Sequence, residues 1–269
     1  MNSAERDQIL WRHLRDLPYF RAMLRAVEDS FYQDIQLVPP TLDLGCGDGH
    51  FASVAFARPL DIGLDPFHEA IHEADARKAY LKSIQADGAI QPFDDAFFGS
   101  AISNSVLEHI PYIQEVLNEL GRVMKQGGLF VFCTPNHRFN DNLWGVGLFI
   151  KLRLPGLADW YMRFYNLIAR HKYCDSPGTW EQRLNEAGFE LVKTWDYFPP
   201  GALHILEWGH LFGLPSLFCR KLTGRWILIR RRWNLIIPWL LTRRFLDHPA
   251  GDDGTMSFYI ARRKVITGG

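Results

Sequence analysis

The pattern of apolar and polar positions changes along the chain, and each change predicts a different kind of element. Apolar residues recur at helical spacing over residues 5–33, with an interruption at Pro18, which predicts one or two amphipathic helices. Short apolar runs then alternate with amphipathic stretches over residues 41–134. Alternation of this kind predicts a parallel sheet that is covered by helices on both faces.

The alternating part resolves into five predicted strands and three predicted helices. Each strand is a short apolar run, and each helix is a longer stretch with apolar residues on one side. The strands are expected at residues 41–44, 60–64, 82–86, 100–104 and 129–134, and the helices at residues 50–57, 67–79 and 111–124.

Beyond residue 135 this rhythm is lost. Residues 136–172 are rich in aromatic side chains and are expected to be irregular. A helix is predicted at residues 176–187, and further strands at residues 190–198 and 256–262. About fifty residues separate these two strands, far more than most connections contain, so we expect an insert there.

Composition narrows the class of protein. The 269 residues are 47% hydrophobic, which supports a folded core, and the net charge of zero gives no general attraction to nucleic acid. The four cysteines form no CxxC pair, so neither a metal site nor a disulfide framework is predicted. The N-terminal stretch is charged and lacks the apolar run of a signal peptide, which favours a cytoplasmic location.

The first predicted strand runs directly into Gly45-Cys46-Gly47-Asp48-Gly49. Closely spaced glycines let the backbone turn sharply and approach a ligand, and the helix that follows offers unpaired N–H groups at its start. Such a turn can also be purely structural, so the neighbouring strands decide what it means.

Two acids stand at the ends of the next two strands. Asp65 ends the second strand, where a carboxylate can accept hydrogen bonds from both hydroxyls of a ribose. Asp87 ends the third strand, where it can accept a bond from an adenine amino group. Each acid alone could cap a turn. Three such features after three successive strands instead indicate a nucleotide-like cofactor.

At this point the sequence resembles the class I S-adenosylmethionine-dependent methyltransferases, in particular the type 11-like branch that methylates small molecules. The resemblance is strongest over residues 41–135, and its motifs follow one another in the expected order. The matching segments are residues 42–49, Asp65, Asp87 and residues 91–93, 103–110, 122–128 and 180–189.

The resemblance implies a Rossmann-like α/β fold with a seven-stranded, mostly parallel sheet, helices on both faces and an antiparallel last strand. Residues 1–40 would form an N-terminal helical segment, and residues 41–269 the methyltransferase domain. Within that domain, residues 136–175 would cover the substrate, and residues 199–250 would form a helical insert between the last two strands.

The resemblance also implies S-adenosylmethionine as the cofactor. Asp43 and the loop backbone would hold its methionine end, Asp65 its ribose and Asp87 its adenine. A nicotinamide cofactor is disfavoured, because His50 stands where a dinucleotide loop needs its third glycine. The predicted cofactor-binding residues are Asp43, Gly45, Cys46, Gly47, Gly49, Asp65, Asp87, Gly88 and Asn104.

Methyl transfer from a sulfonium is an in-line displacement, so the enzyme must chiefly align donor and acceptor. A general base is needed only when the acceptor has to lose a proton. His109, after the fourth strand, and His137, after the fifth, are the candidate catalytic residues, with His171 and Tyr173 as further candidates. Glu108 fits a residue at a helix start better than a catalyst.

Residues 203–245 contain eight basic residues and one acid, Glu207, whereas the rest of the chain has 22 basic and 29 acidic residues, so positive charge is concentrated in this segment. Tryptophan, leucine and isoleucine mixed with arginine is typical of a segment that lies at a membrane surface. The same composition fits a helical cap packed on the domain, and both interpretations stay open; nucleic acid is an unlikely partner. The basic residues are Arg220, Lys221, Arg225, Arg230, Arg231, Arg232, Arg243 and Arg244.

Taken together, these patterns predict a cytoplasmic methyltransferase that acts on a hydrophobic or lipid-linked small molecule, and peripheral attachment to a membrane is one of the two open interpretations of the insert. An accessory protein of the same fold, which binds the cofactor but is catalytically silent, is the alternative. The intact glycine loop and both acids favour catalysis.

Overall fold

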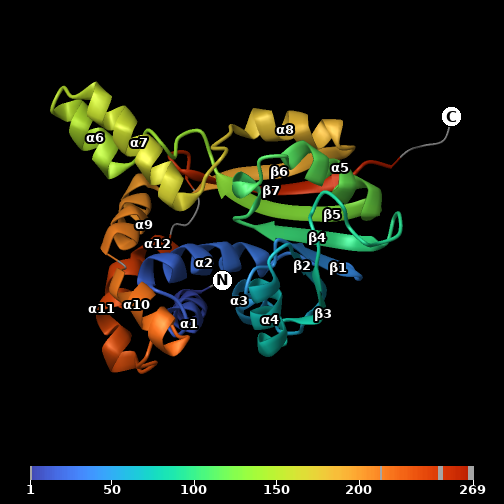
Figure 1. Ribbon diagram of the computed structural model, residues 1–269, viewed down its shortest axis with the longest axis horizontal. Coiled ribbons are helices and arrows are strands. Elements are labelled where there is room, and N and C mark those ends of the chain that lie inside the picture. Colours follow the sequence, from blue (N-terminus) through green and yellow to red (C-terminus); the bar gives the residue numbers. More distant parts are fainter. Residues whose placement is uncertain (1, 213, 248–250, 266–269) are drawn as a thin grey trace. The chain divides into compact units, whose positions relative to one another are not determined.

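The computed structural model describes residues 2–212, 214–247 and 251–265 of the chain, which divides into two compact units (Figure 1). We call them the sheet unit and the helical unit. The sheet unit comprises Ile35–His137, Asn166–Trp195 and Met256–Gly269, and the helical unit comprises Met1–Asp34, Arg138–Tyr165 and Asp196–Thr255.

A seven-stranded sheet with the order β3-β2-β1-β4-β5-β7-β6 forms the sheet unit. The neighbours from β3 to β5 pair in parallel, whereas β7 runs antiparallel to β5. The predicted fold class is therefore confirmed, including the antiparallel last strand. The strands are β1 (Thr41–Leu44), β2 (Leu60–Asp65), β3 (Tyr80–Gln85), β4 (Phe98–Asn104), β5 (Met124–Pro135), β6 (Phe189–Tyr197) and β7 (Met256–Arg263).

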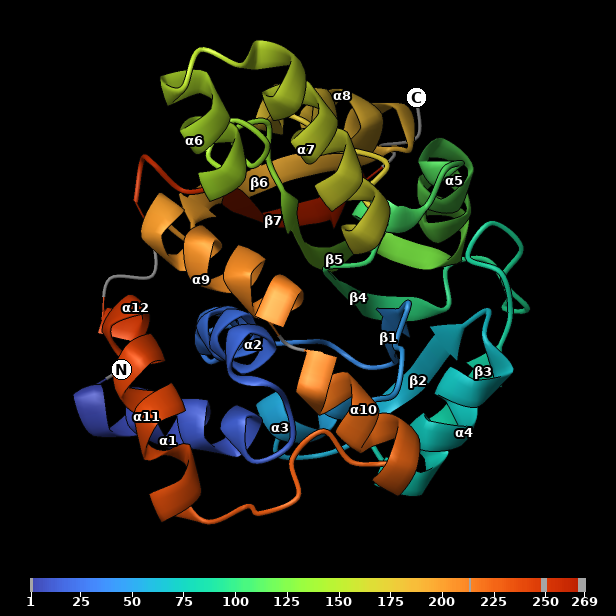
Figure 2. The same cartoon turned by 60° about the vertical axis from the view of Figure 1, so that its left-hand side comes forward.

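Helices cover both faces of this sheet (Figures 1 and 2). On one face, α5 (Ile113–Val123) and α8 (Pro177–Glu186) bury their apolar sides against the central strands. On the other face lie α3 (His50–Ala55) and α4 (His68–Arg77). Every residue of β4 is buried, which explains why the central strands read as continuous apolar runs.

An aromatic stack joins α8 to the sheet. The ring of Phe132 on β5 lies 4.5 Å from that of Tyr259 on β7 and 5.2 Å from that of Trp180 on α8, measured between ring centroids. All three side chains are fully buried. This stack holds α8 against the antiparallel end of the sheet.

Arg122 joins two of the motifs that carry the family resemblance. Its guanidinium donates hydrogen bonds to the carbonyl oxygens of Gln91 and Phe93, at 3.1 and 2.9 Å, and pairs with Glu119 at 2.7 Å. The turn at residues 91–93, which follows β3, is therefore held by the last turn of α5.

The helical unit contains residues 1–34 of the N-terminal segment and the predicted insert. Asn2 and Glu5 form a capping box at the first helix, and Pro18 stands at the start of the second, as its position in the sequence predicted. The helices are α1 (Ser3–Leu14), α2 (Tyr19–Tyr32), α6 (Trp144–Lys151), α7 (Pro155–Ala169), α9 (Pro200–Phe212), α10 (Leu214–Thr223), α11 (Arg232–Thr242) and α12 (Arg244–Asp247).

The insert between the last two strands is helical, as expected, and consists of α9 to α12. Residues 213 and 248–250 of the predicted insert lie outside the described residues. Glu207, on α9, is fully buried and binds α6 and α7. The carboxylate accepts the backbone N–H groups of Trp144 and Gly145, at 2.6 and 3.0 Å, and the hydroxyl of Tyr161 at 2.5 Å.

The expectation that residues 136–172 are irregular is wrong, because α6 and α7 lie there. Apolar residues occupy several sides of these helices, so no amphipathic period is visible in the sequence. On α7, Leu157 and Trp160 are exposed while Tyr165 is buried. No helix in the described parts of the chain combines the length and the hydrophobicity needed to span a membrane.

Candidate cofactor site

The sheet unit has one edge at which the predicted site residues converge. Strands β3, β2, β1 and β4 are adjacent and parallel, so their carboxyl ends meet there. The order of connection reverses at β1, which lies between β2 and β4. In open α/β sheets, ligands bind in the crevice outside the carboxyl ends at such a switch point.

The glycine loop after β1 forms a concave backbone surface. At Gly45, φ is +78°, and a Cβ atom there would overlap Val106, so only glycine fits. The N–H groups of Gly45 and Cys46 bond to the carbonyl oxygen of Leu64, at 2.8 and 3.0 Å, which ties the loop to β2. At Gly47, φ is +54° and no atom lies within 4 Å of the position a Cβ would take. A ligand can therefore approach the loop backbone closely.

Asp65 lies beside this loop and is only 6% exposed. Its two carboxylate oxygens accept the backbone N–H groups of Gly47 and Phe67, each at 3.0 Å. Burial raises the pKa of Asp65 above its ordinary value, and these two bonds act in the opposite direction. Each carboxylate oxygen keeps a second lone pair. The geometry thus fits a ribose, whose two hydroxyls need two acceptors.

Two tyrosines that sequence reasoning missed bind the other predicted acids. The hydroxyl of Tyr80 on β3 donates to Asp43 at 2.6 Å, and both side chains are buried. The hydroxyl of Tyr112 donates to Asp87 at 2.7 Å, and this bond raises the pKa of Tyr112. Asp87 also accepts the N–H group of Ala89 at 2.8 Å. Both acids are therefore held in fixed orientations at the carboxyl edge.

The remaining predicted cofactor residues line the same edge. Asn104, at the end of β4, is 7% exposed, and its amide oxygen accepts the thiol of Cys133 at 3.1 Å. Burial raises the pKa of the Cys46 thiol, so it remains protonated near neutral pH and cannot serve as a nucleophile. Gly88 packs against Leu44 and Val116.

The structure brings two of the candidate bases together. The rings of His109 and His171 stack with their centroids 5.5 Å apart and their planes 28° apart. His109 lies in a short 3-10 helix, η1 (Leu107–His109), directly after β4. The backbone carbonyl of Glu108 accepts the N–H groups of Lys172 and Tyr173, at 2.7 and 3.3 Å. This bonding holds the segment with His171 against η1.

The hydrogen bonding of His109 assigns its tautomer. Its Nδ1 lies 3.1 Å from the carbonyl oxygen of Arg170, which can only accept, so Nδ1 carries the proton. In the neutral ring the lone pair is then on Nε2. That atom lies 3.8 Å from the carboxylate of Glu108, which would stabilise the ring after it takes up a proton.

The other two candidates are placed less favourably for proton transfer. The hydroxyl of Tyr173 donates to the carbonyl of Pro111 at 2.6 Å, and Arg183 lies over its ring at 4.6 Å. His137 is exposed beyond the end of β5, and within the described residues no ring contact joins it to the histidine pair. Across the same residues, nowhere do three histidine, cysteine or acidic side chains gather to hold a metal ion.

Comparisons with known proteins identify the family. A family model described as a methyltransferase domain matches residues 11–194. An uncharacterized methyltransferase of Mycobacterium sp. (strain JLS) is 34% identical over 91 residues, which are 34% of this chain and 36% of that protein. The ubiquinone biosynthesis O-methyltransferase of Vibrio atlanticus (strain LGP32) is 30% identical over 113 residues, 39% of this chain and 47% of that one. The chain therefore matches less than half the length of either relative.

A solved structure with the same fold extends over more of the chain. It is a S-adenosylmethionine-dependent methyltransferase from Thermotoga maritima, a possible histamine N-methyltransferase, with a TM-score of 0.55 and 15% identity. The match covers 91% of each chain. The residues that the family model matches, 11–194, span the glycine loop, Asp65 and Asp87. The chain therefore belongs to the class I S-adenosylmethionine-dependent methyltransferases, and S-adenosylmethionine is its cofactor.

Proposed function

We propose that the chain methylates a hydrophobic or lipid-linked small molecule at the cytoplasmic surface of a membrane. The arrangement of Asp65 beside the glycine loop carries the catalytic part of this proposal, because it offers two acceptors and an open backbone at the switch point of the sheet. The exposed apolar helices of the helical unit support the hydrophobic and membrane part.

The residues at the carboxyl edge have separate roles in this proposal. Asp65 would accept the two ribose hydroxyls of the cofactor, and the backbone of Gly45–Gly49, together with Asp43, would hold its methionine end. Asp87, oriented by Tyr112, faces the adenine. The cofactor supplies a methyl group that is already activated by a positive sulfur. The task of the protein is then to exclude water and to hold the acceptor in line with that methyl group.

For a hydroxyl acceptor, His109 takes the proton. The lone pair on its Nε2 would receive the acceptor's proton, while the cofactor held at the carboxyl edge would supply the methyl group. Glu108 then stabilises the protonated ring, and His171 holds the ring plane by stacking on it. For an acceptor without a proton to lose, alignment alone is sufficient.

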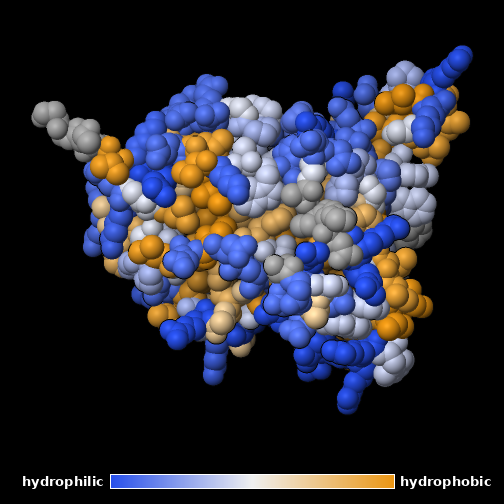
Figure 3. Space-filling view, turned by 180° about the vertical axis from the view of Figure 1, so that it is seen from behind, coloured by the Kyte–Doolittle hydropathy of each residue, from blue (hydrophilic) through white to orange (hydrophobic). Residues whose placement is uncertain are grey.

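Three helices of the helical unit present apolar side chains to solvent, which supports a hydrophobic acceptor or a membrane surface. Apolar colour gathers over α6 and α7 at the upper right of Figure 3 and over α11 at its lower right. On α7, Leu157 is 44% exposed, Trp160 57% and Phe164 37%. A relative with 30% identity is named for ubiquinone biosynthesis, and that name is consistent with a hydrophobic acceptor.

The charge of the insert supports a membrane surface. Glu207 is buried in hydrogen bonds, so the eight basic residues of residues 203–245 face no exposed acid of the same segment. Each arginine or lysine near an anionic surface contributes about 1 kcal/mol. Several acting together are sufficient for reversible binding, which should weaken as salt screens them.

The proposal is tested by label transfer. The purified protein is incubated with S-adenosylmethionine that carries a labelled methyl group and with a lipid extract from cells, and the organic phase is then counted and fractionated. Label in one lipid fraction, absent with Asp65→Ala, is the expected result. Tight cofactor binding with no labelled product from organic or aqueous extracts would instead favour a catalytically silent accessory protein.

The membrane part has its own test. Wild-type protein should float with vesicles that contain anionic lipid at low salt and should be released as salt rises. A variant with Arg230, Arg231 and Arg232 replaced by glutamate should stay in solution. Failure of the wild-type protein to float would contradict membrane association and would leave the methyl-transfer proposal standing.

A further inference from the structure

Within the helical unit, the N-terminal helix and the insert enclose a pocket of about 610 Å³. One wall is a single face of α1, on which Gln8, Trp11, Arg12 and Arg15 recur at helical spacing. The opposite wall is the start of α11 and the residues just before it. These are Arg230, Arg231, Arg232, Trp233 and Leu235. The pocket thus has five arginines and no acid among its lining residues.

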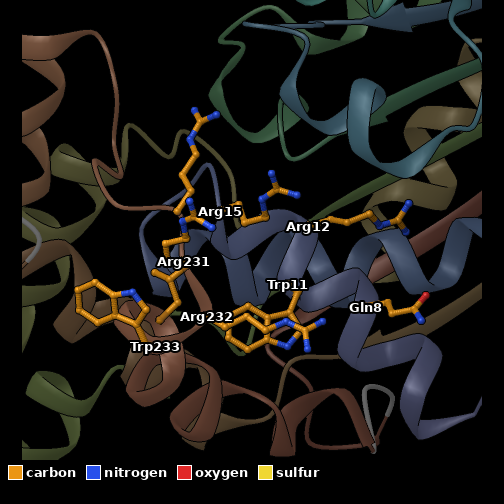
Figure 4. Close-up of a pocket in the computed structure, with 9 residues that line it drawn as sticks. Gln8, Trp11, Arg12, Arg15, Arg231, Arg232 and Trp233 are labelled. Atoms are coloured by element: carbon orange, nitrogen blue, oxygen red, sulfur yellow. The ribbon is translucent and has the colours of Figure 1, made fainter.

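Aromatic stacking orders part of this pocket. The rings of Trp11 and Trp239 lie parallel within 13°, with their centroids 5.9 Å apart. The guanidinium of Arg232 lies 5.4 Å from the centre of the Trp11 ring, and Figure 4 shows the two side chains against each other. Stacking of this kind restricts the side chain and lowers the entropy lost when it binds an anion.

Nearby acids compensate only two of the five charges. Arg230 pairs with Asp16 at 2.8 Å, and Arg12 lies 3.6 Å from Asp29. Arg15, Arg231 and Arg232 form no ion pair with any residue that the structure describes. Three like charges beside one pocket repel one another, and a bound anion would relieve that repulsion. Guanidinium groups match the oxygens of a phosphate in pairs.

The helix that forms one wall also carries an exposed apolar stripe. Its members recur at spacings of three and four residues, so they lie on one side of α11. An apolar stripe that faces solvent, next to a cationic pocket, matches a molecule with an acyl chain and an anionic head. The stripe consists of Trp233, Ile236, Ile237, Leu240 and Leu241, each between 43% and 69% exposed.

We propose that this pocket binds the phosphate headgroup of an anionic lipid, with the apolar stripe of α11 against the acyl region of the membrane. The inference rests on the membrane part of the proposed function and adds a specific site to it. A single-stranded nucleic acid also carries phosphates, but it offers no partner for the aliphatic side chains of α11.

The first test measures the pocket without a membrane. Dihexanoyl phosphatidic acid, kept below its micellar concentration, is titrated calorimetrically into the full chain. Arg15→Gln/Arg231→Gln should weaken binding at least about tenfold, because two charge-assisted bonds are lost. The matched control is Arg58→Gln/Lys82→Gln, which removes two exposed charges outside both the pocket and the insert. The affinity of the control variant for this lipid should differ from that of the wild type by less than about threefold.

The second test repeats the comparison on vesicles. Phosphatidylcholine vesicles with phosphatidic acid should carry the wild-type protein and the control variant upward in a density gradient, but not Arg15→Gln/Arg231→Gln. An equal loss of vesicle binding in the two variants would mean that the protein's positive charges attract the membrane without a specific site, and would overturn the proposal. Binding of inorganic pyrophosphate without binding of either lipid form would assign the pocket to a soluble anion, and tighter binding of a single-stranded RNA would assign it to nucleic acid. Either result would overturn the lipid proposal.

The same preparations are titrated with S-adenosylhomocysteine and assayed for label transfer. Both variants should bind S-adenosylhomocysteine like the wild type, which also verifies that they are folded. Lipid binding without label transfer would contradict the proposed methylation alone. Label transfer without any pocket-dependent lipid binding would contradict the pocket alone.

Discussion

Replacing Asp65 by alanine removes the acceptor on which cofactor binding depends. In the structure its two oxygens each accept one backbone N–H group and each retain a lone pair for a ribose hydroxyl. A hydrogen bond to a charged group contributes about 1.5–3 kcal/mol. Loss of even one such bond corresponds to about a tenfold weaker affinity or more, and loss of both to about a hundredfold or more.

The assay is calorimetric titration with S-adenosylhomocysteine. Asp61→Ala is the matched control, because Asp61 lies on the same strand and accepts the N–H and hydroxyl of Thr41 at 2.7 and 2.9 Å. That variant should be less stable but should keep its cofactor affinity. An Asp65→Ala protein that is folded by circular dichroism and binds as tightly as the wild type would refute the assignment and leave Asp65 as a turn cap.

Lowering the pH should weaken cofactor binding, as the substitution of Asp65 does. Burial raises the pKa of Asp65, so its carboxylate is protonated at a higher pH than an exposed aspartate. A protonated carboxyl accepts the ribose hydroxyls less well. Cofactor affinity should therefore be full well above the raised pKa and fall as the pH drops through it, and Asp65→Ala should lose this part of the pH dependence.

Three further predictions concern other parts of the chain. Glu207→Ala leaves three donors without their acceptor and should lower the free energy of unfolding by about 3 kcal/mol or more, measured in denaturant; Glu207→Gln, whose amide oxygen still accepts, should lose less. With a hydroxyl acceptor, His109→Ala should reduce turnover on the order of 100-fold and His171→Ala less, both with unchanged cofactor affinity; unchanged rates would exclude the pair as the base. Gly45→Ala should lower the melting temperature, and Val106→Ala should restore part of that loss by removing the overlap but not the positive φ.

The strands and the cofactor loop were predictable from sequence because local patterns determine them. A strand buried on both faces reads as an apolar run, and a backbone turn at positive φ demands glycine, so β1, β2 and the loop at Gly45 stand out without any tertiary information. Once the strands are recognised, their ends are known as well, and Asp65 and Asp87 stand out as the acids at the end of β2 and just after β3.

The remaining features depend on contacts between distant residues. Tyr80 reaches Asp43 only because β3 and β1 flank β2 in one sheet. The sequence of neither strand predicts that order. The stacking of His109 on His171 likewise joins residues that are far apart in the chain. The pocket brings Arg15 to Arg231 across most of the sequence. Helices α6 and α7 were not predicted, because apolar residues also occupy their exposed sides and hide the helical period of the sequence.

The central claim is that the carboxyl edge of the sheet unit binds S-adenosylmethionine. Its most direct test is calorimetric titration of the full chain with S-adenosylhomocysteine and, separately, with NAD. We predict saturable binding of one S-adenosylhomocysteine per chain, with no heat from NAD under the same conditions. Tight binding of NAD with no response to S-adenosylhomocysteine would contradict the account.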